Sequence, residues 1–491
     1  MRGPLSFTTL TFLVFLLAVF GLHWIARGRL GQNLVVLGGS YVFYGWWDPR
    51  FCALLLGSSV IDFAIARALG QAGASDRWRR ALLASSCVVN LGVLGLFKYY
   101  DFFVDSFVAL LASFGLSPGV PTLHLILPVG ISFYTFQTLG YTIDVYRRRT
   151  APCSSLLDYL CYVAFFPQLV AGPIERADRL LPQLQRARSF DEGLARDGGR
   201  QIVWGMFEKL VIADHLGEFV DLVYTDGPIH ARGPVLAVAT VAFAFQIYCD
   251  FAGYSNIAIG TAKLFGVRLS RNFATPYFSR SIAEFWRRWH ISLSTWFRDY
   301  VYVPLGGSRR GRARLWLSLM LTFTLSGLWH GANWTFVLWG AVNGLLVGLT
   351  LAGPKRARLG PDHRPPPLRS RAGLVALARM LGTFTVITAT WVLFRAADLG
   401  QALTIFGRIA QDALRPSAWA ELNHHREFLD GFAPLLAIFV IVEWLTQARE
   451  HPLAAVEAWP RALRWTLYTT LIWATIYLLS DEPGAFIYFQ F

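Results

Sequence analysis

The chain has 491 residues, of which 54% are hydrophobic and only 15% are charged, and its formal net charge at pH 7 is +14. This composition excludes a set of soluble domains and predicts a multi-pass membrane protein surrounded by lipid. The basic excess would suggest nucleic acid as the partner of a soluble protein. Here it lies in short loops between apolar segments, which is the positive-inside pattern, so no nucleic acid is expected.

Apolar segments long enough to cross ~30 Å of hydrocarbon as helices recur along the chain. The first, residues 5–22, runs into Arg27 and Arg29 without a small-residue cleavage site. We therefore interpret it as an uncleaved first span rather than a signal peptide. The next four predicted spans cover residues 33–47, 52–69, 81–97 and 123–143.

Two later segments do not read as straight spans. Residues 156–172 have basic residues on both sides and are interrupted by Pro-Gln and Gly-Pro pairs, which predicts a re-entrant element buried in protein. Residues 315–351 also begin and end beside basic loops, so we expect a broken or hairpin element whose deepest point is SGLWHGAN, residues 326–333. Gly327 and Gly331 would let backbones approach closely there.

The remaining spans are predicted at 202–223, 234–262, 374–393, 432–447 and 465–480. The basic loops 147–149 and 355–371 are expected on the cytoplasmic side, and the loop 396–430 on the outside.

His330 lies near the deepest point of the hairpin element. An imidazole at membrane depth needs partners for both nitrogens, and it is a functional candidate because leaving it unsatisfied in hydrocarbon is costly. A helix-packing histidine is the alternative. Asn333 follows three residues later and, if this part is helical, shares a face with His330 and could orient the ring or a substrate carbonyl. We expect no metal site, because no second histidine or carboxylate stands at ligand spacing.

The stretch 280–315 mixes tryptophans with arginines and ends in a Gly-Gly turn and a basic run. It predicts an interfacial helix with its tryptophans at headgroup level, namely Trp286, Trp289 and Trp296. Its arginines would face phosphate-rich water or an anionic ligand, namely Arg287, Arg288 and Arg298. The basic run is either a positive-inside tail or a docking site for the phosphates of a soluble donor such as coenzyme A, with Arg309, Arg310, Arg312 and Arg314 as candidates.

Two further polar residues are candidates. His290 is flanked by aromatic residues just inside the expected membrane edge, and we place a positioning role ahead of proton transfer. Asp250 is a carboxylate deep in an apolar segment, and with Ser255 and Asn256 it forms a polar stripe that is expected to line the bundle interior and orient substrate. Pairing of Asp250 with a histidine stays open.

Five long stretches together resemble the membrane-bound O-acyltransferases. They are SYVFYGWWDPRF (40–51), FFPQLVAGPIERADRLLPQ (165–183), QIYCDFAGYSNIAIG (246–260), EFWRRWHISLSTWFRDYVYVPLGG (284–307) and SGLWHGANWTFVLWG (326–340). The resemblance covers nearly the whole chain. It is similar more narrowly to the bacterial membrane subunit of alginate O-acetylation and its relatives that acetylate other exported polysaccharides.

The resemblance implies an all-α, polytopic transmembrane helical bundle with re-entrant or broken helices around a central tunnel. A single domain would cover residues 1–491, with the cytoplasmic interfacial motif at 280–314 and the catalytic-histidine segment at 315–351. The family's tunnel histidine maps onto His330, and its second, cytoplasmic-side histidine maps onto His290. As catalytic base, a neutral imidazole at His330 would take the proton of a hydroxyl that attacks a thioester carbonyl.

The resemblance also implies a substrate path. An acetyl group would leave acetyl-coenzyme A at the cytoplasmic face of the bacterial inner membrane and reach an exported polysaccharide such as alginate, directly or through a periplasmic acetyltransferase partner, with no tightly bound cofactor. Two alternatives stay open. One is transfer of another acyl group, such as D-alanine, to a cell-wall polymer, and the other is a non-enzymatic transporter or flippase.

Overall fold

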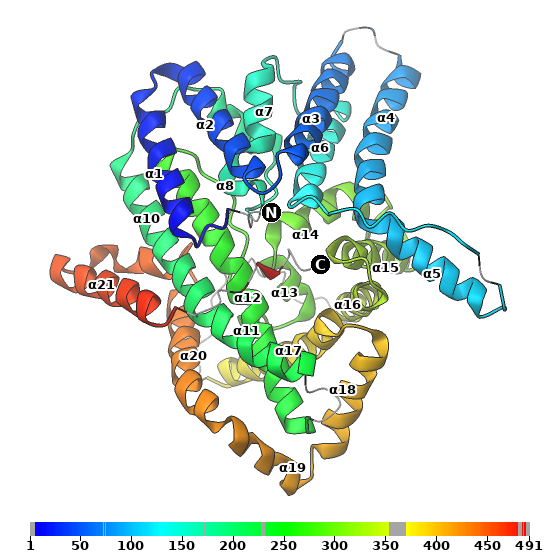
Figure 1. The fold of residues 1–491 in the computed structure, drawn as a ribbon, viewed down its shortest axis with the longest axis vertical. Coiled ribbons are helices and arrows are strands. Elements are labelled where there is room, and N and C mark those ends of the chain that lie inside the picture. Colours follow the sequence, from blue (N-terminus) through cyan, green and yellow to red (C-terminus); the bar gives the residue numbers. More distant parts are fainter. Residues whose placement is uncertain are drawn as a thin grey trace. The chain divides into compact units, whose positions relative to one another are not determined.

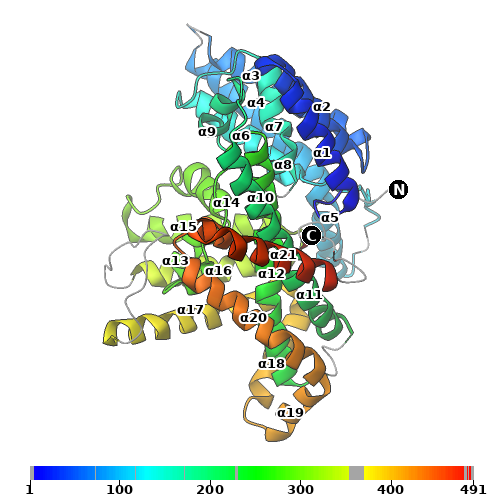
Figure 2. The same cartoon turned by 90° about the vertical axis from the view of Figure 1, so that its left-hand side faces the viewer.

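The structure, a computed structural model, describes residues 5–71, 73, 75–116, 118–170, 172–226, 231–352, 370–479, 484, 486 and 487. Within these residues every regular element is a helix (Figures 1 and 2), which confirms the predicted all-α class. Six helices of the described part are long and apolar enough to cross a membrane: Arg50–Leu69, Asp76–Ala112, Gly233–Leu264, Trp334–Leu351, Arg371–Arg395 and Pro416–Thr446. The chain is therefore a multi-pass membrane protein.

The described residues gather into two compact units. The first comprises Met1–Gly199 with Ala258–Ser270, and the second comprises Arg200–Ile257 with Arg271–Phe491. Both histidine candidates and Asp250 belong to the second unit. The single domain over residues 1–491 stays a prediction.

The first unit is built on nine helices: α1 (Leu10–Ile25), α2 (Gly28–Gly45), α3 (Arg50–Leu69), α4 (Asp76–Leu94), α5 (Tyr100–Ala112), α6 (Ile131–Tyr146), α7 (Leu156–Ala164), α8 (Phe166–Leu169) and α9 (Ala177–Leu184). The predicted interruption of 156–172 is confirmed, because α7 ends at Ala164 and the short α8 follows a non-helical Phe165. Two predicted spans have the wrong limits. The span 81–97 continues through a π-helical turn at 95–99 into α5.

The second incorrect limit is at the start of α6. The described residues of 118–130 are not helical, so the first part of the predicted span 123–143 is wrong. Pro121 and Pro128 lack the N–H that a helix interior needs, and Gly130 takes a left-handed conformation with φ 75° directly before Ile131. Hydrophobicity alone did not reveal these breaks.

The second unit holds the helices that carry the candidate site: α11 (Asp214–Asp221), α13 (Ile282–Arg288), α14 (Ile291–Phe297), α15 (Gly311–His330), α16 (Trp334–Ala352), α17 (Arg371–Arg395), α18 (Leu399–Asp412), α19 (Pro416–Ala420), α20 (Arg426–Thr446) and α21 (Arg461–Tyr477). Two more helices contribute residues to both units, namely α10 (Glu192–Met206) and α12 (Gly233–Leu264). The predicted loop 396–430 is instead largely helical, with α18, α19 and the start of α20 in it.

Helices α15 and α16 form the hairpin that the sequence predicts at 315–351 (Figure 1). Their backbones come close at small residues. A Cβ on Gly327 would lie 3.1 Å from the Cα of Gly340 and closer still to the carbonyl oxygen of Phe336. A Cβ on Gly331 would overlap the Phe336 ring. The predicted close approach of backbones is confirmed at Gly327, whereas Gly331 makes room for a side chain.

We expect Gly327→Ala to lower the free energy of unfolding by about 1–3 kcal/mol, because the added methyl group meets backbone atoms that cannot move aside. Thermal unfolding in detergent measures the effect. Gly382→Ala on α17 is the matched control, since nothing lies within 4 Å of the added Cβ. Equal melting temperatures for the two variants would contradict the tight contact.

Candidate active site

His330 is the last residue of α15 and lies in a cage of aromatic rings. Gly331, which follows, is extended and ends the helix. The imidazole is only 3% exposed, and its ring centroid lies 5.0 Å from Trp329, 5.2 Å from Trp339 and 5.4 Å from Phe394. Helices α15, α16 and α17 each supply one of these rings. Such a site keeps water away from the ring.

His290 lies between α13 and α14 and is also buried. Its backbone is left-handed, with φ 42°, which is uncommon for a residue with a side chain and is typical of constrained functional positions. Its ring contacts Phe251 at 4.6 Å and Trp329 at 6.1 Å, measured between centroids. The structure therefore brings the two candidate histidines to the same tryptophan, Trp329.

The protonation state of His290 follows from its burial. Burial in this aromatic surrounding lowers the pKa of His290 to about 3, so the ring is neutral near pH 7. Its Nδ1 lies 3.1 Å from Oδ1 of Asn272, a residue that sequence reasoning missed. Asn272 is 18 positions earlier in an irregular segment, and no periodic pattern links the two.

Asp250 on α12 is buried as expected, but it pairs with a lysine. Its Oδ1 lies 2.7 Å from Nζ of Lys209, and its Oδ2 accepts a hydrogen bond of 2.8 Å from the backbone N–H of Ile487. Lys209 also donates to Asp214 at 2.6 Å and to the carbonyl of Gly484 at 2.8 Å. Asp250 thus anchors described residues of the C-terminal segment. Its role in orienting substrate stays a prediction.

The anchored segment reaches the surroundings of His290. Phe486 packs on Tyr254 at 4.3 Å and on Phe251 at 5.6 Å, between ring centroids. Phe251 in turn contacts the His290 ring. Sequence reasoning did not single out Lys209, although a lysine within the apolar run around FEKLVIA, residues 207–213, was a usable signal.

The predicted shared helical face of His330 and Asn333 is wrong, because α15 ends at His330. Asn333 instead precedes α16, and its Oδ1 accepts the N–H of Thr335 at 3.0 Å. Its Nδ2 donates to the carbonyl of Ala397 at 2.8 Å. These bonds cap α16 and tie it to the segment after α17. A contact between Asn333 and substrate stays a prediction.

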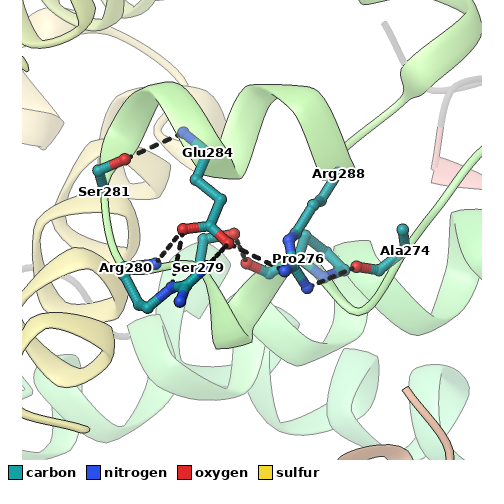
Figure 3. A network of polar contacts seen from close by, with 7 residues as sticks. All are labelled: Ala274, Pro276, Ser279, Arg280, Ser281, Glu284 and Arg288. Atoms are coloured by element: carbon teal, nitrogen blue, oxygen red, sulfur yellow. Dashed lines mark hydrogen bonds and ion pairs between the residues drawn. The ribbon is translucent and has the colours of Figure 1, made fainter. Parts of the chain in front are cut away.

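The interfacial interpretation of 280–298 is wrong for several residues. Trp289 and Trp296 are buried, and so is Arg288, because they pack into the second unit instead of facing headgroups. Arg288 donates to Glu284 at 2.9 Å, and Arg280 donates to the same carboxylate at 3.0 Å. Figure 3 shows Glu284 between the two guanidinium groups. Arg287 and Arg298 are exposed, as predicted.

The basic run surrounds the start of α15. Arg309, Arg310 and Arg312 are exposed, so their side chains are accessible to a soluble anion. Arg314 is half-buried, and its Nε donates to the carbonyl of Leu305, which braces the Gly-Gly turn. Donor binding by the four arginines stays a prediction, and the geometry favours the first three.

The amino-acid sequence is similar to a known family and to several proteins in it. The family model of the membrane-bound O-acyltransferases (MBOAT) matches residues 147–352. The chain is 38% identical to a probable alginate O-acetylase of Pseudomonas putida, over 99% of this chain and 100% of that protein. It is 40% identical to a probable alginate O-acetylase of Pseudomonas aeruginosa, over 82% of this chain and 74% of the relative. It is 32% identical to a peptidoglycan O-acetyltransferase of Helicobacter pylori, over 79% of this chain and 76% of that protein.

Proposed function

The chain belongs to the membrane-bound O-acyltransferase family and is an acyltransferase, and from this premise we propose that it transfers acetyl groups from acetyl-coenzyme A to an exported polysaccharide such as alginate. The transfer would cross the bacterial inner membrane, and a periplasmic partner protein would complete it. Support for acetyl and for a polysaccharide comes from the names of the similar O-acetylases and of the peptidoglycan O-acetyltransferase. Because the chain belongs to an enzyme family, the alternative of a non-enzymatic transporter or flippase is excluded.

The observation that carries the proposal is the buried His330 in its aromatic cage, beside the tryptophan that it shares with His290. In the proposed reaction, the neutral His330 imidazole accepts the proton of the acceptor hydroxyl as the hydroxyl oxygen attacks the acetyl carbonyl carbon. The C–S bond then breaks, and the leaving thiolate takes that proton from the imidazolium. The surrounding rings keep water out and so suppress hydrolysis of the thioester.

Reconstituted protein tests the proposal directly. Proteoliposomes are given acetyl-coenzyme A that is radiolabelled in the acetyl group, together with deacetylated alginate and a periplasmic extract as separate additions. We expect label in the polysaccharide, and a requirement for the extract would establish the partner. A parallel reaction is given a D-alanyl thioester in place of acetyl-coenzyme A. Transfer of D-alanine but not of acetyl would contradict the proposed donor.

The exposed arginines give a prediction about the donor. Replacing Arg309, Arg310 and Arg312 with glutamine should raise KM for acetyl-coenzyme A several-fold with little change in kcat, because phosphate contacts bind the ground state and the transition state alike. The effect should shrink in high salt. Arg77→Gln with Arg80→Gln, two exposed arginines of the first unit, is the control. An unchanged KM in normally inserted protein would show that these arginines do not bind the donor and act only as a signal for membrane topology.

A further inference from the structure

The orientation of the Asn272 side chain is fixed by its neighbours. Its Oδ1 accepts from the Ser292 backbone N–H at 3.3 Å and from the Ser292 hydroxyl at 2.9 Å, while its Nδ2 donates to the hydroxyl of Ser255 at 3.1 Å. A backbone N–H can only donate, so the amide oxygen must be on this side. Asn272 is buried, and an exchange of its oxygen and nitrogen would leave two donors facing each other.

This orientation determines the tautomer of His290. The same Asn272 oxygen lies 3.1 Å from Nδ1 of His290 and can only accept a hydrogen bond. Nδ1 therefore carries the proton. In a neutral imidazole the other nitrogen, Nε2, then has the lone pair, so it accepts protons and hydrogen bonds and cannot donate one.

We infer that Asn272 is a positioning residue for acyl transfer, which selects the Nδ1–H tautomer of His290 and so makes its Nε2 an acceptor. This inference rests on the proposed function in assuming that His290 takes part in the transfer. It gives His290 a defined chemical role: its Nε2 receives an N–H or O–H of a substrate, and it does not stabilise the developing oxyanion, which requires a donor.

Further contacts hold the backbone around His290, besides the bond from the Ser292 N–H to the Asn272 side chain. The N–H of Ile291 donates to the carbonyl of Asn272 at 2.9 Å, and the N–H of Ala274 donates to the carbonyl of Arg288 at 2.9 Å. The Arg288 guanidinium, held by Glu284, also donates to the carbonyl of Ala274 at 3.4 Å (Figure 3). These contacts do not involve the Asn272 side chain, so they remain when it is replaced and limit the movement of the His290 backbone.

Three charged residues on the elements around His290 have partners other than the imidazole. Asp250 on α12 pairs with Lys209, Arg271 donates to the carbonyl of Phe273, and Arg288 pairs with Glu284. The His290 ring is surrounded by the aromatic side chains of Phe251, Phe273 and Trp329. A carboxylate introduced at position 272 would thus be the dominant new charge beside the imidazole.

Two variants separate a positioning role from a structural one. Asn272→Leu keeps the branched shape of the side chain and removes its acceptor, so kcat should fall by about 10²-fold or more while KM changes little. The variant also leaves the buried Ser292 N–H without its acceptor, so its melting temperature should fall, and kcat is measured at a temperature where the variant is folded. Asn272→Asp keeps an acceptor and adds a charge that favours the imidazolium and raises the pKa of His290. This variant should be active at high pH and lose activity as pH falls, with its acid limb at higher pH than in the wild type.

Ser59→Ala is the control, because this buried hydroxyl on α3 of the first unit donates to the Leu55 carbonyl of its own helix. A purely structural Asn272 would make Asn272→Asp as inactive as Asn272→Leu at every pH. That result would overturn the inference, as would a wild-type kcat for Asn272→Leu.

A measurement that needs no activity keeps this test separate from the proposed function. Nitrogen-15 NMR of histidine-labelled protein in bilayers distinguishes the two tautomers, and the His290 signal is identified by its loss in His290→Ala. We expect Nδ1–H in the wild type and a mixture in Asn272→Leu. An Nε2–H wild type would overturn the inference even if acetyl transfer is confirmed. Failure of acetyl transfer with an Nδ1–H ring would overturn only the proposed function.

Discussion

Replacing His330 with alanine should reduce acetyl transfer to background while the protein still inserts and folds. Loss of a general base typically lowers a rate by about 10²–10⁴-fold. The ring makes edge contacts with aromatic neighbours from three helices, and these helices keep many other apolar contacts. Turnover of label from acetyl-coenzyme A, measured at matched amounts of purified protein, gives the result.

His23→Ala is the matched control for removing a buried imidazole. His23 on α1 of the first unit is fully buried and packs edge-on against Trp24 at 4.8 Å and Phe265 at 5.1 Å, between centroids. Its loss should affect stability to a similar extent but leave acetyl transfer. Near-normal turnover of His330→Ala would exclude His330 as the catalytic base. An inactive His290→Ala with normal donor binding, together with a His330→Ala variant that keeps turnover, would assign the base to His290 instead.

Much of the helical architecture could be predicted because hydrophobic length and small residues are local signals. The hairpin at 315–351 and the close approach of backbones at Gly327 follow from the sequence in this way. The structure of the tryptophan- and arginine-rich stretch could not be predicted in this way. Its composition suits a membrane interface, but Trp289 and Trp296 are buried, and Glu284 neutralises Arg288 one helical turn away. The i,i+4 spacing of that pair was the available signal.

The polar core of the candidate site depends on contacts between distant residues. Asn272 reaches His290 because an irregular segment runs beside it, and Lys209 meets Asp250 from 41 positions away along the chain. Periodicity describes one element at a time, so it cannot show that such residues meet. What the sequence does show is an ionisable residue in an apolar run, and that signal holds for both Lys209 and Asp250.

The second large effect is expected at Lys209, which holds two buried carboxylates and the C-terminal segment. Its ammonium group lies 2.6 Å from Asp214 and 2.7 Å from Asp250, and all three side chains are nearly inaccessible to solvent. Lys209→Met would leave both carboxylates buried without their cation. Breaking a buried ion pair from one side costs about 3–5 kcal/mol, which approaches the whole stability of many domains.

We therefore expect Lys209→Met to unfold at a much lower temperature or to fail to accumulate, as measured by thermal unfolding and size-exclusion chromatography in detergent. Adding Asp214→Asn and Asp250→Asn should restore much of the stability, because neutral amides need no cation and the amide oxygen at position 250 still accepts the Ile487 N–H. Arg196→Met, which breaks the exposed pair with Glu192, should change little. A melting temperature for Lys209→Met equal to that of Arg196→Met would show that the buried cluster does not hold this part of the fold together.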